Sequence, residues 1–339
     1  MNKVELHHIW KIFGPNPQYV LERMNNGNSR AEILRETGHV LAVRDVSFEV
    51  GQGEIFVVMG LSGSGKSTLV RCLSRLIEPT AGKVIINGTD VTGMNEHELR
   101  ELRRHTVSMV FQRFGLFPHR RIMDNVGYGL EIQGVPVEER RNKARQILEL
   151  VGLKGWENHY PHELSGGMQQ RVGLGRALAV DPEIMLCDEP FSALDPLIRR
   201  DMQNELLNLQ KTLHKTILFI THDFLEAIKL GDRIAIMKDG EIVQLGTPQE
   251  IVAHPVNEYV REFTRDVPRA KVLTAATIMH PPPQTSAPGA QSVPQDWTLE
   301  QLIPIVLSNE QTVHVLNEAG QVVGQLDRQM ILAAMAEAA

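Results

Sequence analysis

The stretch EIFVVMGLSGSGKST, residues 54–68, decides the fold of this chain. Residues 54–59 form a nearly continuous apolar run, which is typical of a strand buried on both faces of a parallel sheet. Residues 60–67 match the pattern G-x-x-x-x-G-K-[ST], and an amphipathic helix is predicted to follow over Ser67–Leu76. A buried strand, a glycine-rich turn and a helix in this order predict a phosphate-binding loop in an α/β fold.

The residue types of this loop suit a nucleotide triphosphate. Glycines let backbone N–H groups turn onto phosphate oxygens, and the positive end of the helix dipole adds to that attraction. Lys66 is expected to reach the β- and γ-phosphates, while the Ser67 hydroxyl ligates Mg²⁺. The residues expected to contact ATP here are Gly60, Ser62, Gly63, Ser64, Gly65, Lys66, Ser67 and Thr68. The alternative is a merely flexible Gly/Ser loop, and the flanking strand and helix argue against it.

Another apolar strand, predicted over Glu183–Cys187, ends in the two carboxylates Asp188 and Glu189. A carboxylate at the carboxyl end of such a strand faces the crevice where open α/β sheets bind their ligands. Asp188 is expected to hold Mg²⁺ directly or through water, because Mg²⁺ keeps several waters and takes few protein ligands. Glu189 is placed to act as general base on an attacking water. Alternatively, both side chains only cap the loop.

Further motifs follow one another along the chain. Gln112 ends the triplet VFQ, and Leu164-Ser-Gly-Gly167 opens a predicted helix. Ser192-Ala-Leu-Asp195 follows the two carboxylates, and His222 follows a predicted strand, Thr216–Ile220. Together with the phosphate loop, this order of motifs resembles the ABC-type ATPases. The resemblance implies a P-loop cassette with a mostly parallel core sheet, an antiparallel β subdomain and a helical subdomain over about residues 113–176.

The resemblance also implies roles for individual residues. Catalysis is assigned to Glu189, His222, Lys66 and Gln112, and the metal to Ser67, Gln112 and Asp188. His222 contacts the γ-phosphate and positions the water and Glu189; a lone histidine after a strand is more often structural. The nucleotide contacts outside the phosphate loop are Phe13, Ser165, Gly166, Gly167 and Asp195.

Some of these residues have a simpler structural interpretation as well. Phe13 resembles the aromatic on which adenine stacks, yet core packing is an alternative. Ser165 and Asp195 both suit the N-cap of a helix. Met168 stands where the commonest signature has Gln. That departure is mild, because the groups facing phosphate are the Ser hydroxyl and backbone amides at a helix N-terminus.

A pair of cassettes is expected, because in this family the phosphate loop of one copy meets the signature helix of the other. The signature helix presents partial positive charge and donors to a γ-phosphate that only ATP supplies. ATP thus favours the closed homodimer, or a dimer with a close homologue, and hydrolysis removes that preference. A two-fold arrangement gives two equivalent sites.

Over residues 1–270 the chain resembles most closely the ATPases of osmoprotectant importers for glycine betaine, proline betaine and choline. The stretches that carry this resemblance are the insertion Pro15–His39, the loop start Gly60-Leu-Ser-Gly63, and Phe191–Arg199. It implies transmembrane permease subunits, an indirect link to an extracytoplasmic substrate-binding protein, and a peripheral place on the cytoplasmic face of the bacterial inner membrane. Phe114, Leu116, Phe117 and Pro118, expected on a helical segment, resemble the permease-docking surface; a subdomain core is the alternative.

Composition agrees with a globular chain that lacks its own membrane span. The net charge of −6 argues against a nucleic-acid partner, because phosphate backbones select basic surfaces. Cys72 and Cys187 stand in apolar contexts, so no disulfide framework is implied. There is no signal-like apolar core near the N-terminus and no run of about 18 apolar residues.

Beyond the cassette, residues 271–295 are rich in Pro, Ser and Ala and are expected to form a linker that resists packing. Residues 296–339 regain apolar periodicity as helix, strand, Gly320 turn, strand and helix. They resemble a single CBS repeat where the family usually has two. Their only basic residue is Arg328, against six acidic residues, which are Asp296, Glu300, Glu310, Glu318, Asp327 and Glu337. This tail is therefore not expected to sense anionic lipid, because an acidic surface is repelled by it.

Three functions are candidates for a chain with these motifs. The favoured one is the ATPase of an importer for a quaternary amine, with an importer of another small solute, such as an amino acid, as the nearby alternative. A non-transport ABC ATPase of DNA repair or translation lacks support, since neither coiled-coil insertions nor a second cassette occurs. An inactive, CBS-regulated binding module is disfavoured because Lys66, Asp188, Glu189 and His222 are all present.

Overall fold

The structure is a computed structural model that describes residues 2–23, 29–112, 115–282, 291–308 and 312–336. Contacts between Cα atoms divide the chain into two compact units, Met1–Ile242 and Val243–Ala339. This division comes earlier than the domain boundary expected at residue 270. The physical reason is that α11 (Pro248–Ala253) packs against three later helices, α12 (Glu258–Thr264), α13 (Arg269–Val272) and α14 (Ala275–Ile278).

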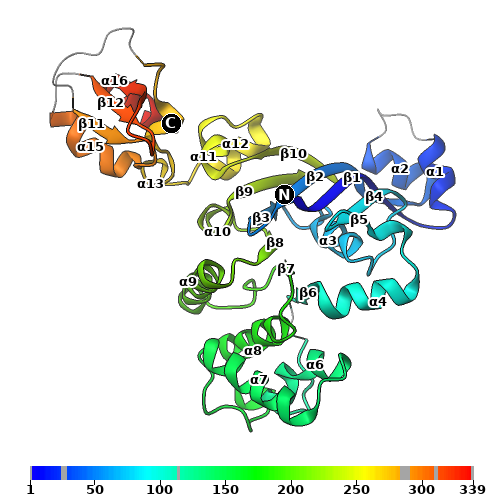
Figure 1. Cartoon of the computed structure of the whole chain (residues 1–339). Coiled ribbons are helices and arrows are strands. Elements are labelled where there is room, and N and C mark those ends of the chain that lie inside the picture. Colours follow the sequence, from blue (N-terminus) through cyan, green and yellow to red (C-terminus); the bar gives the residue numbers. More distant parts are fainter. Residues whose placement is uncertain (1, 24–28, 113–114, 283–290, 309–311, 337–339) are drawn as a thin grey trace. The chain divides into compact units, whose positions relative to one another are not determined.

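A six-stranded sheet of order β10-β9-β3-β8-β7-β6 carries the site (Figure 1). Its strands, in chain order, are β3 (Ile55–Met59), β6 (Val107–Val110), β7 (Ile184–Asp188), β8 (Thr216–Thr221), β9 (Arg233–Lys238) and β10 (Glu241–Gly246). Neighbours from β9 to β6 are parallel. Every residue of β3, β7 and β8 is buried, which is why these strands are apolar throughout. The strands predicted at these three places are confirmed.

A four-stranded sheet of order β2-β1-β4-β5 forms the antiparallel part of the first unit. Its strands are β1 (Asn2–Phe13), β2 (Val40–Gly51), β4 (Ala81–Ile86) and β5 (Thr89–Asp90). The insertion between β1 and β2 folds as α1 (Pro17–Arg23) and α2 (Arg30–Thr37). A small apolar core attaches it to the sheet, made of Ile12, Val20, Ile33 and Leu41. Helix α2 begins with a capping box at Ser29 and ends at Gly38, which has a φ of 70°.

The helices of the first unit flank the main sheet and build a separate helical part, seen as α6, α7 and α8 at the bottom of Figure 1. They are α3 (Lys66–Leu73), α4 (Glu96–His105), α5 (Ile122–Val126), α6 (Tyr128–Ile132), α7 (Val137–Leu150), α8 (Gly166–Ala179), α9 (Pro196–Leu213) and α10 (Phe224–Leu230). Mutual contacts of α5, α7 and α8 hold the helical part together. The helices predicted over Ser67–Leu76, after the stretch Leu164-Ser-Gly-Gly167 and after Asp195 are present as α3, α8 and α9.

The second unit ends in a three-stranded sheet of order β11-β12-β13. Its elements are β11 (Ser292–Pro294), α15 (Leu299–Ser308), β12 (Val313–Leu316), β13 (Val322–Leu326) and α16 (Arg328–Ala336). The predicted helix, strand, turn, strand and helix are confirmed. The linker expectation is wrong at residues 271–279, which include α14 and the buried Leu273 and Ala275, and at residues 292–294, which pair in parallel with β12. Val293 is buried there, so an apolar contact and a strand partner outweigh the Pro-rich composition; residues 283–290 lie outside the described part.

Within the described ranges, no helix has the length and apolar character needed to cross a lipid bilayer. Both cysteine thiols are free and buried. Burial raises the pKa of Cys72 and of Cys187 to about 12, so neither thiol is poised to react.

Candidate active site

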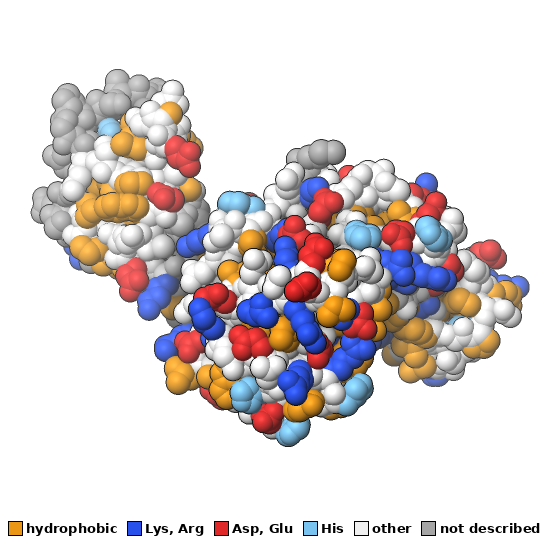
Figure 2. All heavy atoms as spheres, turned by 60° about the horizontal axis from the view of Figure 1, so that its bottom comes forward, with side chains coloured by type: hydrophobic (Ala, Val, Ile, Leu, Met, Phe, Trp, Pro, Cys, Tyr) orange, Lys and Arg blue, Asp and Glu red, His pale blue; other side chains and the backbone are white. Residues whose placement is uncertain are grey.

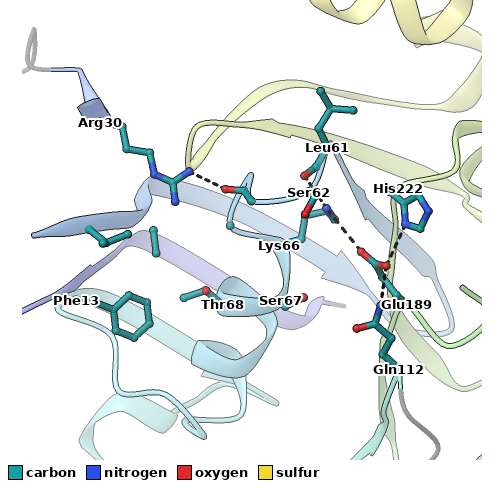
Figure 3. A pocket seen from close by; sticks show the side chains of 14 residues that line it. Phe13, Arg30, Leu61, Ser62, Lys66, Ser67, Thr68, Gln112, Glu189 and His222 are labelled. Atoms are coloured by element: carbon teal, nitrogen blue, oxygen red, sulfur yellow. Dashed lines mark hydrogen bonds and ion pairs between the residues drawn. The ribbon is translucent and has the colours of Figure 1, made fainter. Parts of the chain in front are cut away.

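A cavity of about 590 Å³ opens where β3, β7 and β8 end (Figure 3). Strand ends of an open α/β sheet are the usual place for a ligand. Its lining combines the phosphate loop with side chains from six other segments of the first unit. The lining residues are Phe13, Arg30, Val40, Ala42, Leu61, Ser62, Gly63, Gly65, Lys66, Ser67, Thr68, Gln112, Glu189 and His222.

The phosphate loop has a backbone that side chains would disrupt. Gly60 and Gly65 have φ values of 152° and 105°, which L-residues rarely adopt. A Cβ on Gly60 would lie 2.3 Å from the carbonyl oxygen of Met237, and one on Gly65 would lie 2.2 Å from that of Ala42. Glycine is therefore required at both positions, because the loop lies directly against two neighbouring strands. Ser64 is buried beneath it and does not line the cavity.

Lys66 lies almost fully buried at the base of the loop. Its Nζ donates to the carbonyl oxygens of Gly60 at 2.7 Å and Leu61 at 3.0 Å, and lies 3.9 Å from Oε1 of Glu189. Burial lowers the pKa of the Lys66 ammonium, while the nearby carboxylates of Glu189 and Asp188 act in the opposite direction. A cation is thus held at the base of the cavity against a desolvation cost.

Ser67 and Asp188 meet although they come from different elements. The Ser67 hydroxyl on α3 donates to Oδ1 of Asp188 at the end of β7, at 2.7 Å. Oδ2 of the same carboxylate pairs with Nη2 of Arg71 at 3.2 Å. A hydroxyl and a carboxylate are hard oxygen donors, and two such ligands fit Mg²⁺, which takes its other ligands from water and phosphate. The donor set therefore suits the metal expected from the sequence.

Glu189 is the meeting point of three elements. Its Oε2 lies 3.0 Å from Nδ1 of His222, which follows β8, and accepts a hydrogen bond of 3.3 Å from Nε2 of Gln112, which follows β6. Gln112 also donates to Oγ of Ser192 at 3.3 Å. Glu189 has φ 46°, in the left-handed region that few non-glycine residues occupy. Such backbone strain concentrates at functional sites.

Phe13, at the end of β1, lies at the opposite side of the cavity from Glu189 (Figure 3). Its ring is 40% exposed, and Nζ of Lys11 lies 4.9 Å from the ring centroid. A core-packing role does not fit a ring with this exposure. Sequence reasoning did not identify Arg30, Val40, Ala42 and Leu61, which also line the cavity. Leu61 stands at a variable position of the phosphate-loop motif, and no local motif marks the other three.

The signature residues Ser165, Gly166 and Gly167 are not among the described residues that line the cavity. Ser165 is the N-cap of α8, and its Oγ accepts from the amide of Met168 at 3.4 Å. A Cβ on Gly167 would lie 2.5 Å from Cγ2 of Ile198, so α8 and α9 approach closely there. Asp195 likewise lies outside the lining and caps α9 by accepting from two amides, each at 3.1 Å.

The segment after Gln112 differs from its prediction. Residues 115–121 contain no helix, and α5 begins only at Ile122; Phe114 lies outside the described residues. Phe117 is partly buried, with its ring 4.6 Å from that of Tyr128 and Arg120 over its face at 5.4 Å. The side-chain amide of Asn125 holds this segment as a turn. Its Oδ1 accepts from the N–H of Phe117, and its Nδ2 donates to the carbonyl oxygen of the same residue.

Nearby, a groove of about 250 Å³ lies between β6, α4, α6 and α8. Its lining is predominantly apolar and includes Leu76, Met109 and Phe111, of which Leu76 and Phe111 are exposed. Exposed apolar patches on folded proteins mark sites of interaction with proteins, membranes or ligands.

Comparisons with known proteins agree with this geometry. A sequence model of the family described as ABC transporter matches residues 43–192. The chain is 58% identical over 277 residues to the glycine betaine transport ATP-binding protein OpuAA of Bacillus subtilis, covering 82% of this chain and 66% of that protein. It is 49% identical over 329 residues to the trimethylamine N-oxide transport system ATP-binding protein TmoW of Pelagibacter ubique, covering 97% and 96%.

A solved structure also matches, the dimeric ATP-binding cassette MJ0796 in a post-hydrolysis state bound to ADP and Pi. Its TM-score is 0.61 at 32% sequence identity, and the match covers 72% of this chain and 98% of that one. The expected cassette fold is thereby confirmed. The motifs, the cavity and these relatives lead to one assignment: this chain belongs to the ATP-binding subunits of ABC transporters and is an ATPase.

Proposed function

We propose that this chain powers the uptake of a small solute with a methylated nitrogen, such as glycine betaine, by hydrolysing ATP in the cavity of its first unit. The observation that carries the catalytic part is the convergence of Gln112 and His222 on one carboxylate, Glu189. Lys66 and the Ser67–Asp188 pair lie beside it in the same cavity or at its edge.

The proposed reaction is in-line attack of water on the γ-phosphorus of ATP. Glu189 accepts a proton from the water, whose oxygen forms a bond to phosphorus while the bond to the β–γ bridging oxygen breaks, leaving ADP and phosphate. Lys66 and the amides of the phosphate loop bind the triphosphate charge. His222 positions Glu189 and contacts the γ-phosphate, and Phe13 stacks on the adenine ring.

Mg²⁺ belongs with this substrate. Ser67, Asp188 and Gln112 would hold the ion, which neutralises charge on the β- and γ-phosphates when bound. In addition, Arg71 pairs with Asp188 at 3.2 Å and so orients that carboxylate.

Two cassettes are proposed to act together as a homodimer or with a close homologue. Ser165, Gly166 and Gly167 lie away from the cavity of their own chain, which fits a role at the site of a second copy. Asp195 is proposed to contact that copy as well as to cap α9. MJ0796, the similar cassette, is dimeric in its solved structure.

The groove beside β6 supports a permease partner. Its exposed apolar residues Leu76 and Phe111 would receive a segment of a transmembrane subunit, which would hold the chain at the cytoplasmic face of the bacterial inner membrane. A substrate-binding protein would act indirectly, through the permease. On the face shown in Figure 2, basic and acidic side chains are interspersed, and we propose no nucleic-acid partner.

Trimethylamine N-oxide is a second candidate solute. The relative named for its transport aligns with nearly the whole chain, whereas OpuAA extends well beyond the match. Both solutes carry a tetrahedral, trimethylated nitrogen, so the two candidates belong to one chemical class. We also propose that residues 291–336, with the order β11-α15-β12-β13-α16, form the single CBS-like module.

Purification of the chain together with its permease, from membranes of the organism that makes them, tests the proposed transport function. The tagged chain would be purified with its permease, reconstituted with the substrate-binding protein, and assayed for ATP hydrolysis with glycine betaine, trimethylamine N-oxide, choline or a neutral amino acid. We expect stimulation by a trimethylated solute and none by the amino acid. Stimulation by the amino acid alone would overturn the solute class, and a chain that copurifies with no membrane subunit would overturn the transport role.

A further inference from the structure

We propose that Arg30, contributed by the insertion between β1 and β2, is an additional ATP-binding residue that acts on the phosphate part of the nucleotide. This inference rests on the proposed use of the cavity for ATP. It concerns a residue outside the phosphate loop, the strand-end carboxylates, the signature and the switch histidine.

Arg30 reaches the phosphate loop directly. Its Nη1 donates a hydrogen bond of 2.7 Å to the carbonyl oxygen of Gly63, and its side chain lines the cavity with Lys66 and Ser67 (Figure 3). In a phosphate loop the amides turn inward onto the anion. A cation bound to a carbonyl of the same loop therefore holds the loop from its outer side while placing positive charge at the rim of the cavity.

The charge on Arg30 is not neutralised by a neighbour. Among the described residues the Arg30 guanidinium has no carboxylate within 4.0 Å, and its bond to Gly63 is the single side-chain hydrogen bond that the structure gives it. The nearest acid on its own helix, Glu32, is occupied, because it accepts from the backbone N–H of Ser29 at 2.7 Å. The guanidinium has five N–H donors, so most of them are free to bind phosphate oxygens.

Two cations at the phosphate end of the cavity, Lys66 and Arg71, differ in this respect. Lys66 lies 3.9 Å from Glu189 and bonds to two carbonyl oxygens, and Arg71 is paired with Asp188. A triphosphate carries several negative charges, and carboxylates beside Lys66 and Arg71 offset part of their attraction for it. Arg30 thus supplies a cation that no carboxylate of the described site offsets.

The fold holds Arg30 in this place. Ser29 and Glu32 form a capping box at the start of α2, and Ile33 of the same helix packs into the small core with Leu41. Arg30 is the first residue of that helix and is half-buried. A guanidinium on a capped and packed helix loses less freedom on binding than one on an unanchored loop, which favours binding.

The test compares Arg30→Gln and Arg30→Lys with Arg35→Gln in the full-length chain. Arg35 lies on the same helix, its side chain is 75% exposed, and it pairs with the adjacent Glu36 at 3.6 Å, so its loss controls for the charge of α2 as a whole. Equilibrium dissociation constants for ATP, ADP and AMP would be measured at two salt concentrations. KM and kcat for ATP hydrolysis and the melting temperature would be measured alongside.

We expect Arg30→Gln to weaken ATP binding about tenfold, with a smaller loss for ADP and the smallest for AMP, because the effect follows phosphate charge. KM should rise by a similar factor with kcat changed less than about twofold, since the contact is made before and during the reaction alike. Arg30→Lys should recover part of the affinity, and Arg35→Gln should bind like the unmodified chain.

Equal affinity of Arg30→Gln and the unmodified chain for ATP would overturn the inference. So would a loss equal for all three nucleotides that accompanies a lower melting temperature, because that pattern indicates a purely structural role. If the unmodified chain itself does not bind ATP, the proposed function fails instead, and the two failures are thereby told apart.

Discussion

Oε2 of Glu189 lies 3.0 Å from Nδ1 of His222, which joins the end of β7 to the end of the neighbouring strand β8. Gln112, from the end of β6, donates to the same oxygen. Three adjacent parallel strands therefore deliver one carboxylate and its two partners to a single point. The relationship makes separable predictions for the carboxylate and for the imidazole.

Replacement of the carboxylate should stop the reaction and leave binding intact. Glu189→Gln is expected to lower ATP turnover by about two to four orders of magnitude, because the amide cannot accept a proton from water. The variant should accumulate as an ATP-bound dimer, measured by light scattering with and without ATP. Glu183→Gln, at the opposite end of β7 and paired with Lys3 at the surface, is the matched control and should keep full turnover. Near-normal hydrolysis by Glu189→Gln would remove it from catalysis.

Loss of the imidazole should act on turnover more than on affinity. His222→Ala is expected to lower kcat by about 100-fold or more, because Glu189 loses the partner that orients it. The dissociation constant for ATP should change little, since the phosphate loop is unaltered. His105→Ala on α4, at a ring that pairs with Glu101 at 3.4 Å and does not line the cavity described above, serves as the control. Equal kcat values for His222→Ala and His105→Ala would contradict the switch role.

Two glycines of the phosphate loop should tolerate alanine differently. Both Gly63 and Gly65 have positive φ, at 80° and 105°, but only a Cβ on Gly65 meets backbone, at 2.2 Å from the Ala42 carbonyl oxygen. Gly63→Ala should lower the free energy of unfolding by about 1 kcal/mol through backbone strain alone. Gly65→Ala should cost about 3 kcal/mol because the strand must also shift. Denaturant unfolding of both variants measures the difference, and equal losses would refute it.

The buried carboxyl of Glu226 on α10 gives a pH-dependent prediction. It is 5% exposed and accepts from Nε2 of Gln203 at 2.9 Å. Burial raises the pKa of Glu226 above its ordinary value of 4.5, while hydrogen bonds from Thr221 and Gln203 act against that rise. The folded state thus holds this proton more tightly. The protonated carboxyl of Glu226 therefore contributes its full stabilisation below about pH 4.5, and this contribution is lost as pH rises through the pKa of the folded state.

Glu226→Gln should accordingly raise the free energy of unfolding by about 1 kcal/mol at pH 8 and leave it unchanged at pH 4. Glu183→Gln should behave in the opposite sense, because the hydrogen bond from Lys3 lowers the pKa of that carboxyl. Its removal should destabilise the protein at pH 8 and have no effect at low pH. Urea unfolding at both pH values checks the signs, and a gain for Glu226→Gln at pH 4 would contradict the burial argument.

The C-terminal tail is predicted not to respond to anionic lipid. Substitutions that change the charge of the tail test this better than truncation at residue 281. Truncation would break the bond from Arg269 to the carbonyl of Ala334 and the backbone bonds between His280 and Gln325. Only a small fraction of the full-length chain should cosediment with lipid vesicles, and that fraction should be the same for neutral and for anionic vesicles. The double variant that carries Glu300→Lys and Glu318→Lys should bind the anionic vesicles. Strong binding of the unmodified chain that Arg328→Gln removes would show that the prediction is wrong.

Local features of this protein were readable from the sequence because each depends on residues close together in the chain. The cap at Ser29, the stop at Gly38, the cap at Asp195 and the buried strand before the phosphate loop all follow from short spacings. The family motifs likewise are short contiguous stretches of sequence. Their order along the chain was enough to predict the cassette fold, which the comparisons confirm.

Features that depend on distant parts of the chain needed the tertiary structure. Arg30 lines the cavity because the insertion packs on β1 and β2, and no spacing near residue 30 encodes that contact. The turn after Gln112 is held by Asn125, and β11 exists because β12 offers it a partner in a Pro-rich stretch. The sequence by itself determined the family motifs and their order, and with them most of the residues proposed to carry the chemistry. Only the folded chain decided which of them share one cavity, since long-range packing sets those distances.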